Sequence, residues 1–155
     1  MEWVASGVTW KSGRYPFFKA FTTSSIPVVN ELIHSDIEIL IIGGKVRQNE
    51  QSIVAFDYLF NFSELNISKT FICASGITVE KGISDYNLEE ANTRKKIIDL
   101  SQEVYVAAAD STKFGKDVTI GISPLDKIDY IITDDHVHKD FISSFKKTDT
   151  LLILS

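Results

Sequence analysis

Cysteine is nearly absent from this sequence, which has one among 155 residues, and no long hydrophobic run occurs. A single cysteine excludes an internal disulfide framework, and Cys73, inside the apolar run Phe71–Ala74, fits a buried thiol in a reducing cytoplasm. No apolar stretch approaches the ~18 residues that span a bilayer. Residues 1–13 lack the basic stretch, apolar core and cleavage site of a signal peptide. We therefore expect a cytoplasmic protein that makes no contact with a membrane.

Positive charge is also scarce. The chain carries 16 Lys and Arg against 21 Asp and Glu, a net charge of −5 and a pI near 5.2. Surfaces that bind nucleic acids normally show a basic excess, so this chain by itself should bind DNA poorly. Its length and its 44% hydrophobic and 24% charged residues fit one soluble globular domain. No linker rich in Pro or Gly divides residues 1–155, which we treat as a single domain.

Short apolar segments alternate with segments of helical periodicity along most of the chain. We expect strands at residues 17–21, 37–42, 69–74, 104–109, 118–122, 129–133 and 149–154. We expect helices that begin at Ile26 and at Ser52, and others at 86–102 and 138–147. This alternation is typical of βα units, and it predicts an α/β fold with a mostly parallel sheet flanked by helices, Rossmann-like. Residues 1–15 show no clean periodicity, although a short strand or helix is compatible with them.

The stretch Asp110–Gly115 follows an apolar run, residues 104–109, that resembles a strand buried on both faces. Ligands of open α/β sheets usually bind beyond the carboxyl ends of such strands. Lys113 could meet a phosphate or carboxylate there, with neighbouring hydroxyls as neutral donors. The alternative is that Asp110 caps a turn and that Lys113 is solvated, since turns favour the same residue types.

Other polar or small residues follow the remaining strands, at positions that a parallel sheet would bring to one edge. They are Thr22-Thr23-Ser24, Gly43-Gly44, Gly76 and Glu90. Hydroxyls and glycine amides suit a phosphate, and a carboxylate suits sugar hydroxyls, so the set favours a small anionic ligand. Two simpler interpretations stay open: Ser24 or Ser25 caps the helix that begins near Pro27, and the paired glycines permit a tight turn.

Glu90 and Arg94 are four residues apart within the helix predicted at 86–102, for which Asn87 is a plausible N-cap. The pair lies on one helix face. If that face is solvated, the pair contributes a few tenths of a kcal/mol. If it turns into the cleft, the same pair could hold a polyol hydroxyl and a phosphate.

Asp134-Asp135-His136-Val137-His138 contains metal-ligand residue types at close spacing. No second cluster of Cys or His accompanies it, so we prefer a polar helix start with Asp135 as the N-cap, and we expect no metal. The sequence contains neither a P-loop, nor Gly-x-Gly-x-x-Gly, nor a Gly-x-Ser-x-Gly elbow. The motifs therefore indicate no cofactor.

From Thr22 onward the chain resembles the C-terminal sensor domain of DeoR-family bacterial transcriptional repressors. The segments that carry the resemblance are Thr22-Thr23-Ser24 before a helix, Ile41–Gly44, Phe71–Gly82, Glu89–Ala91 followed by Arg94-Lys95, Asp110–Gly115 and Asp129–Asp134. They occur in the family's order and spacing. As an ordered set they are specific.

The resemblance implies an isomerase/CoA-transferase-like α/β fold, similar to ribose-5-phosphate isomerase, that serves as a sensor and not as an enzyme. It implies a domain that binds a phosphorylated sugar or related metabolite and alters the repressor's DNA binding in the control of carbohydrate metabolism. The DNA contacts would come from a winged helix-turn-helix domain, which this chain lacks. Because a repressor that reads a two-fold operator normally needs a dimer, we also expect a homo-oligomer.

The family's effector-binding residues carry over by position. Thr22, Thr23 and Ser24 match its Thr-Asn-Ser loop, with Thr23 in place of Asn. Gly43 and Gly44 match its paired glycines, Glu90 and Lys113 its cleft carboxylate and lysine, and Arg94 stands where Lys is usual. Together with Gly76 these residues form the expected effector-binding set, with no catalytic and no metal-binding residue.

Residues 1–21 match the family poorly. Its first phosphate loop, Gly-Thr-Thr after a strand, has only a poor counterpart in Ser6–Thr9, and Ala55 stands where Gly is usual. The chain is thus expected to be a fragment of a longer regulator or a natural truncation. Two other functions stay open beside the sensor: a sugar-phosphate isomerase with Glu90 as its base, and an oligomerisation module whose cleft binds no ligand.

Overall fold

The fold is built on a seven-stranded sheet. The computed structural model describes residues 7–11, 19–41, 43–54, 67–107 and 110–154. In spatial order the strands are β12 (Leu151–Leu154), β11 (Tyr130–Thr133), β9 (Ser101–Ala107), β6 (Ile67–Ile72), β1 (Gly7–Lys11), β2 (Lys19–Thr23) and β3 (Glu38–Ile41). The four strands β6, β9, β11 and β12 are parallel, and so are β2 and β3. Only β1 is antiparallel to its neighbours, β2 and β6, so the other six strands run in one direction. The predicted mostly parallel sheet is confirmed.

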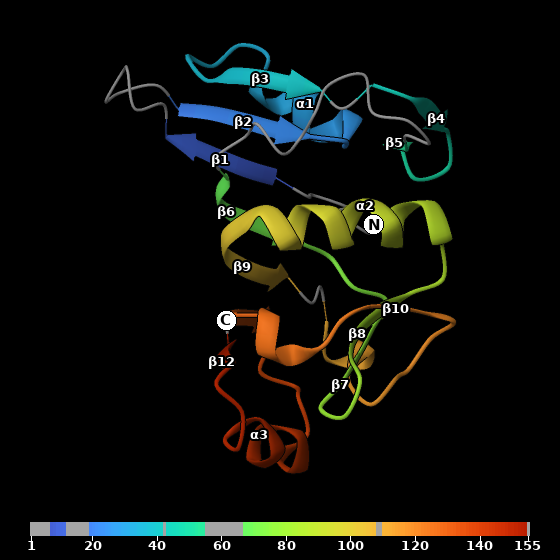
Figure 1. The fold of residues 1–155 in the computed structure, drawn as a ribbon, viewed down its shortest axis with the longest axis vertical. Helices are drawn as coiled ribbons and strands as arrows, with labels where there is room; N and C mark the ends of the chain where they lie inside the picture. Colours follow the sequence, from blue (N-terminus) through green and yellow to red (C-terminus); the bar gives the residue numbers. More distant parts are fainter. Residues whose placement is uncertain (1–6, 12–18, 42, 55–66, 108–109, 155) are drawn as a thin grey trace.

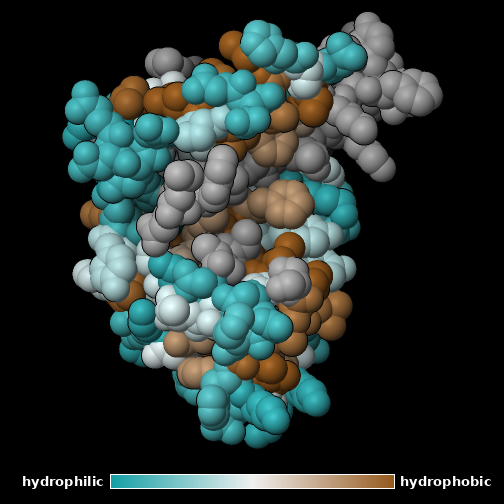
Figure 2. Space-filling model, turned by 180° about the vertical axis from the view of Figure 1, so that it is seen from behind, coloured by the Kyte–Doolittle hydropathy of each residue, from teal (hydrophilic) through white to brown (hydrophobic). Residues whose placement is uncertain are grey.

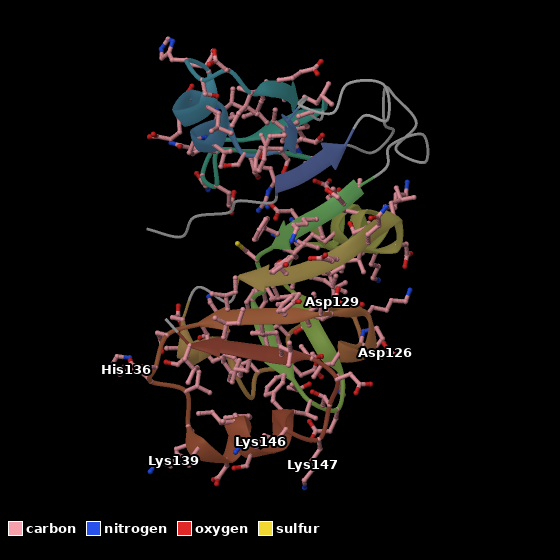
Figure 3. All side chains as sticks on the ribbon, turned by 90° about the vertical axis from the view of Figure 1, so that its left-hand side faces the viewer. Asp126, Asp129, His136, Lys139, Lys146 and Lys147 are labelled. Carbon is pink, nitrogen blue, oxygen red and sulfur yellow. The ribbon has the colours of Figure 1, made fainter. Side chains whose placement is uncertain are left out.

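Helices cover both faces of this sheet. They are α1 (Ile26–Leu32), α2 (Leu88–Leu100) and α3 (Lys139–Phe145). Figures 1 and 3 show α2 across the front of β6 and β9, and α1 on the opposite face beside β2 and β3. The third helix follows β11 and lies near β12. The arrangement confirms an α/β, Rossmann-like fold.

Two smaller sheets and two single turns of 3-10 helix complete the described structure. One sheet is the hairpin of β4 (Lys45–Arg47) and β5 (Ser52–Val54); the other holds β7 (Gly76–Thr78), β8 (Gly82–Asp85) and β10 (Ile120–Ser123). The 3-10 turns are η2 (Ser111–Lys113) and η3 (Leu125–Lys127). The helix predicted from Ser52 is therefore wrong at residues 52–54, which form β5, while 55–60 lie outside the described residues. A β-branched pair, Ile53-Val54, opposite Val46 and Lys45 favours the strand.

The helix predicted at 86–102 is confirmed as α2, which spans Leu88–Leu100. The carbonyl oxygen of the Asn87 side chain accepts a hydrogen bond from the Glu90 amide at 2.9 Å, as an N-cap should. Glu89 and Glu90 in the first turn place negative charge at the positive end of the helix dipole. At the other end Ser101 begins β9 directly, because its backbone is already extended.

The core lies between the front of the sheet and α2, α3 and the smaller sheet of β7, β8 and β10. It contains Ile72, Val104, Val106 and Ile131 from the large sheet, Ala91 and Ile98 from α2, Ile77, Ile83 and Ile122 from the smaller sheet, and Phe114 and Phe145. The Phe114 ring packs edge-on against Phe145 at 5.8 Å between centroids. This one cluster fixes α2 and the loops after β6 and β9 relative to each other.

The prediction that residues 104–109 form a strand buried on both faces is wrong in one respect. Val104 and Val106 are buried against the core, but Glu103 and Tyr105 on the other face are only half-buried. The reason is that no described helix packs over that side of β9. Residues 108 and 109 lie outside the described residues.

Candidate functional site

Most of the predicted site residues lie at or beyond the carboxyl ends of strands that share one direction, and Glu90 and Arg94 lie in α2. The strand β2 ends in Thr22 and Thr23, β3 leads to Gly43 and Gly44, β6 leads to Gly76, and β9 leads to η2 with Lys113. Because these strands are parallel, their ends meet at one edge of the sheet. The strand directions therefore place these strand ends along one edge of the sheet.

A buried network of charges occupies this edge. The Glu90 carboxylate accepts hydrogen bonds from Arg94 at 2.5 Å, from the Ser52 hydroxyl at 3.1 Å and from Arg47. Arg94, only 5% exposed, also donates to Asp85 at the end of β8. The Glu90–Arg94 pair is therefore buried, which excludes the interpretation as a solvated surface pair.

The β4–β5 hairpin ties this network to the end of β2. The Ile53 amide donates to the Ser24 carbonyl at 2.8 Å, and the Ile26 amide donates to the Gln51 carbonyl at 2.9 Å. The Ser25 amide donates to the Thr23 hydroxyl at 3.0 Å. These amides at the start of α1 are already bonded, so they are not an anion site as they stand. Ser25 is the N-cap residue, as expected, but its side chain makes no capping hydrogen bond.

A small pocket opens where hairpin, helix and β2 meet. It is lined by Ser24, Ile53, Val54, Glu90, Thr93 and Arg94. Three predicted site residues, Ser24, Glu90 and Arg94, therefore line one pocket. Hydroxyl, carboxylate and guanidinium groups beside two aliphatic side chains can bind a hydroxyl group of a ligand that reaches into this small pocket.

The other predicted site residues are not among those that line this pocket. Thr22 and Thr23 are buried within β2, and Lys113 is half-buried in η2. Packing explains the glycine at position 76, because a Cβ atom there would lie 2.4 Å from the Lys116 carbonyl oxygen. Gly44 has a φ of +155°, a backbone conformation that residues other than glycine rarely adopt.

The stretch Asp110–Gly115 is held by its own hydrogen bonds. The Asp110 carboxylate accepts from the Thr112 amide at 2.8 Å, so the capping interpretation of Asp110 is confirmed. Phe114 is a core residue, and the Gly115 amide donates to the Ile77 carbonyl at 2.8 Å. With a φ of +73°, Gly115 has the left-handed backbone that favours glycine. This frame places Lys113 in the loop beyond β9.

Asp134 joins the loops after β9 and β11. Its carboxylate accepts from the Ser111 amide and from the His136 amide, each at 2.9 Å. Asp135 is not the N-cap of the last helix: the N-cap is His138, whose Nδ1 accepts from the Asp140 amide at 3.4 Å. The helix begins at Lys139, one residue after the predicted start at 138, and Asp134 caps the turn before it. Ligand atoms of Asp134, Asp135 and His136 lie within 4.8 Å of one another, but the hydrogen bonds to Asp134 account for this grouping.

The bonds to Asp134 predict a pH dependence. Hydrogen bonds from the backbone amides of Ser111 and then His136 hold the pKa of Asp134 below its usual value of 3.8. A carboxyl whose pKa is lowered in the folded state stabilises the fold above its unfolded pKa, and this contribution is lost as the pH falls through the folded pKa. We expect Asp134→Asn to destabilise the domain at pH 7 and to differ less and less from wild type below about pH 4. Urea denaturation at several pH values measures this; a difference independent of pH would contradict it.

Three residues of the network were not predicted from the sequence. Asp85, Ser52 and Arg47 are not in the expected effector-binding set. All three sit at ends of very short strands, where no periodic pattern relates them to α2. The only signal was composition: polar residues at the ends of short strands.

Comparison with known proteins decides the family. Residues 20–135 match the DeoR C terminal sensor domain. The chain belongs to this family. The sensor domain is 29% identical over 120 residues to the HTH-type transcriptional regulator IolR of Bacillus subtilis, which covers 77% of this chain and 47% of IolR. It is 26% identical to a putative aga operon transcriptional repressor of Escherichia coli O157:H7, over 85% of this chain and 49% of that protein.

A third relative has a name that bears on ligand chemistry. The sensor domain is 25% identical to the glycerol-3-phosphate regulon repressor of Escherichia coli K12, over 72% of this chain and 44% of the repressor. The chain thus spans about half the length of the curated relatives it matches. None of the helices in the described part of the sensor domain combines the length and apolar character that a membrane crossing requires.

Proposed function

We propose that this chain is the effector-sensing domain of a transcriptional repressor of carbohydrate metabolism. In this proposal a phosphorylated sugar or polyol binds at the carboxyl edge of the sheet and changes the populations of two states that differ in affinity for DNA. The DNA contacts come from a helix-turn-helix domain outside this chain. The family match supports the sensor role, and the names of the relatives, a glycerol-3-phosphate regulon repressor among them, support the ligand class.

One observation carries the proposal. Ser24, Glu90 and Arg94 come from two distant segments of the chain and line one pocket, with their charged groups buried. Burying charges is costly unless they are paired, and ligand sites typically place a few convergent polar groups beside apolar side chains. The expected set also includes Thr22, Thr23, Gly43, Gly44, Gly76 and Lys113, which we propose to act from the same edge.

The charges suggest how the ligand is oriented. Arg47 and Arg94 face three carboxylates in this network, those of Glu90, Asp85 and Glu50, so the network has no spare positive charge for a phosphate. Sugar hydroxyls, in contrast, can replace the Ser52 or Arg47 donors on Glu90. We therefore place the hydroxyl end of the ligand at Glu90 and its phosphate toward Lys113.

The names of the relatives favour a sensor over an isomerase, because they are transcriptional regulators. An isomerase would need an oxygen of Glu90 within reach of the proton that it abstracts. Both oxygens of Glu90 accept hydrogen bonds, from three donors in all, so a substrate would first have to displace one of these donors.

A thermal-shift screen against phosphorylated hexoses, pentoses and polyols tests the proposal. A ligand at a hundred times its dissociation constant should stabilise the domain by about 2.7 kcal/mol, which raises the melting temperature by several degrees. We expect a shift with a phosphorylated compound, little with its unphosphorylated form, and loss of the shift in Lys113→Ala. Lys116→Ala, an exposed lysine of the same loop, is the matched control. No shift with any phosphate ester would favour the oligomerisation module.

A further inference from the structure

The β4–β5 hairpin forms a two-stranded sheet of its own, which is tied to its surroundings through β5. Within the described residues β4 pairs with no strand other than β5. On the β5 side, the Ile53 amide donates to the Ser24 carbonyl at 2.8 Å. The carbonyl of Gln51, the residue before β5, accepts a hydrogen bond from the Ile26 amide at 2.9 Å. Because isolated two-stranded hairpins are only marginally stable, β4 needs a further contact to stay in place.

Arg47 of β4 supplies that contact. It lies opposite Ser52 in the hairpin, and both side chains donate to the same oxygen of Glu90, Oε1. Arg47 donates to Glu50 as well, at 2.9 Å. The other two residues of β4 are exposed. The ion pair between Arg47 and Glu90 therefore joins β4 to α2, and we call this ion pair the latch.

Of the three donors on Glu90, Arg47 is the one that a ligand can displace at the lowest cost. Ser52 is 2% exposed and lies in the anchored strand, and Arg94 is 5% exposed with a second buried carboxylate as its partner. The Arg47 side chain, in contrast, is 22% exposed. When Arg47 leaves Glu90 it keeps Glu50, and Glu90 keeps Arg94, so no charge is left buried and unpaired. A ligand hydroxyl that donates to Glu90 can therefore take the place of Arg47.

The backbone on either side of β4 permits such a release. Gly43 and Gly44 precede the strand, and Gly44 has a φ of +155°, which glycine adopts readily. On the other side Gln51 has a φ of +50°, a left-handed conformation that other residues keep only where neighbouring contacts impose it. Figure 1 shows the hairpin at the upper right edge of the molecule, near the start of α2, and Figure 2, seen from behind, shows a largely hydrophilic surface at the corresponding upper left corner. Since Val46, the apolar residue of β4, is already 50% exposed, release of β4 breaks little apolar packing.

We infer that Arg47 competes with the effector for Glu90, so that effector binding opens the latch. In the ligand-free domain Arg47 holds β4 on α2. A hydroxyl of the effector that binds Oε1 of Glu90 displaces Arg47, which turns to Glu50, and β4 is released. The inference rests on the proposed function, because the competitor is the hydroxyl end of the effector. It names the element whose position differs between the two states of the sensor, and it makes the apparent affinity depend on how often the latch is open.

Hydrogen exchange followed by mass spectrometry tests the latch in the ligand-free chain. In Arg47→Met, which keeps an apolar stem and removes the charge, the amides of β4 should exchange at least about tenfold faster than in wild type. The amides of β5 should be unaffected, because the bond from Ile53 to Ser24 remains. The matched control is Lys45→Met, the same loss of charge at an exposed position of β4, which should exchange as wild type does. Circular dichroism checks that each variant is folded. Unchanged exchange of β4 in Arg47→Met would overturn the inference and leave the sensor proposal standing.

Calorimetric titration and exchange with ligand use glycerol 3-phosphate, ribose 5-phosphate and glucose 6-phosphate as probes, which are a polyol, a pentose and a hexose phosphate. A probe that binds wild type should bind Arg47→Met roughly three- to tenfold more tightly, because no cation competes for Glu90. At saturation of wild type it should slow exchange at the start of α2 and speed exchange in β4, whereas a ligand held by Arg47 would slow both. Equal or weaker binding by Arg47→Met would overturn the inference. If no probe binds either protein, the sensor proposal and a latch opened by the effector fail together, while the ligand-free exchange still shows whether Arg47 holds β4.

Discussion

Replacing Arg94 with alanine should lower the free energy of unfolding by about 3–5 kcal/mol, because it leaves buried carboxylates without their shared cation. Arg94 donates to both Asp85 and Glu90, and all three side chains are at most 10% exposed. Among the described ion pairs, Asp85 has no partner other than Arg94. Glu90 would keep its bonds from Arg47 and Ser52. Urea denaturation measures the change. Lys95→Ala, the next residue of α2, is the control and should stay within about 0.5 kcal/mol of wild type.

A double-mutant cycle separates the ion pair from the packing of the long side chain. Arg94→Met keeps most of the apolar volume, and Glu90→Gln removes one of the two charges that Arg94 faces. If the ion pair dominates, Arg94→Met should cost at least about 1 kcal/mol less in the Glu90→Gln background than in wild type. Equal costs in the two backgrounds would assign the effect to packing alone.

The second large effect is expected at Gly82, which begins β8. Its φ is +80°, and a Cβ atom there would lie 2.0 Å from the Ser123 carbonyl oxygen and 2.6 Å from the Pro124 Cα. Both atoms belong to the backbone, which cannot move away by a change of rotamer as a side chain can. Gly82→Ala should therefore destabilise the domain by about 2–5 kcal/mol through backbone strain and crowding together.

Gly121 offers the matched control for this prediction. It lies in β10, the strand paired with β8, and a Cβ atom there would meet nothing within 4 Å. Gly121→Ala should change stability by no more than about 1 kcal/mol, in the stabilising direction. Equal urea midpoints for the two variants would contradict this explanation. The close approach of β8 to Ser123 and Pro124 would then not be the reason for glycine at position 82.

Local signals in the sequence predicted much of the fold. The Asn87 cap, the acidic first turn and the apolar spacing of α2 act within a few residues of each other, and the helix was predicted nearly to its ends. The apolar strands β3, β6, β9 and β11 were found for the same reason. The prediction failed at β5, because the apolar spacing from Ser52 onward is helical although residues 52–54 pair with β4 as a strand. The rest of that pattern lies outside the described residues.

The candidate site was predicted less completely, and the reason is tertiary. That Arg94 binds Asp85 depends on β8 ending beside α2, a relation that no residue pattern contains. That Arg47 reaches Glu90 depends on the β4–β5 hairpin, which is held to the end of β2 by backbone bonds from Ile53 and Ile26. Sequence reasoning identified residue types with the right chemistry, but only the fold determines which of them line one pocket.

Isothermal titration calorimetry of the domain with the best phosphorylated compound from the screen tests the central claim most directly. The account predicts one site per chain, and at least tenfold weaker binding, about 1.4 kcal/mol, in Glu90→Gln. Glu89→Gln, the neighbouring acid on the same helix, should bind as wild type does. Unchanged affinity in Glu90→Gln would contradict the placement of the ligand at Ser24, Glu90 and Arg94, and no binding of any phosphorylated sugar or polyol would contradict the sensor function itself.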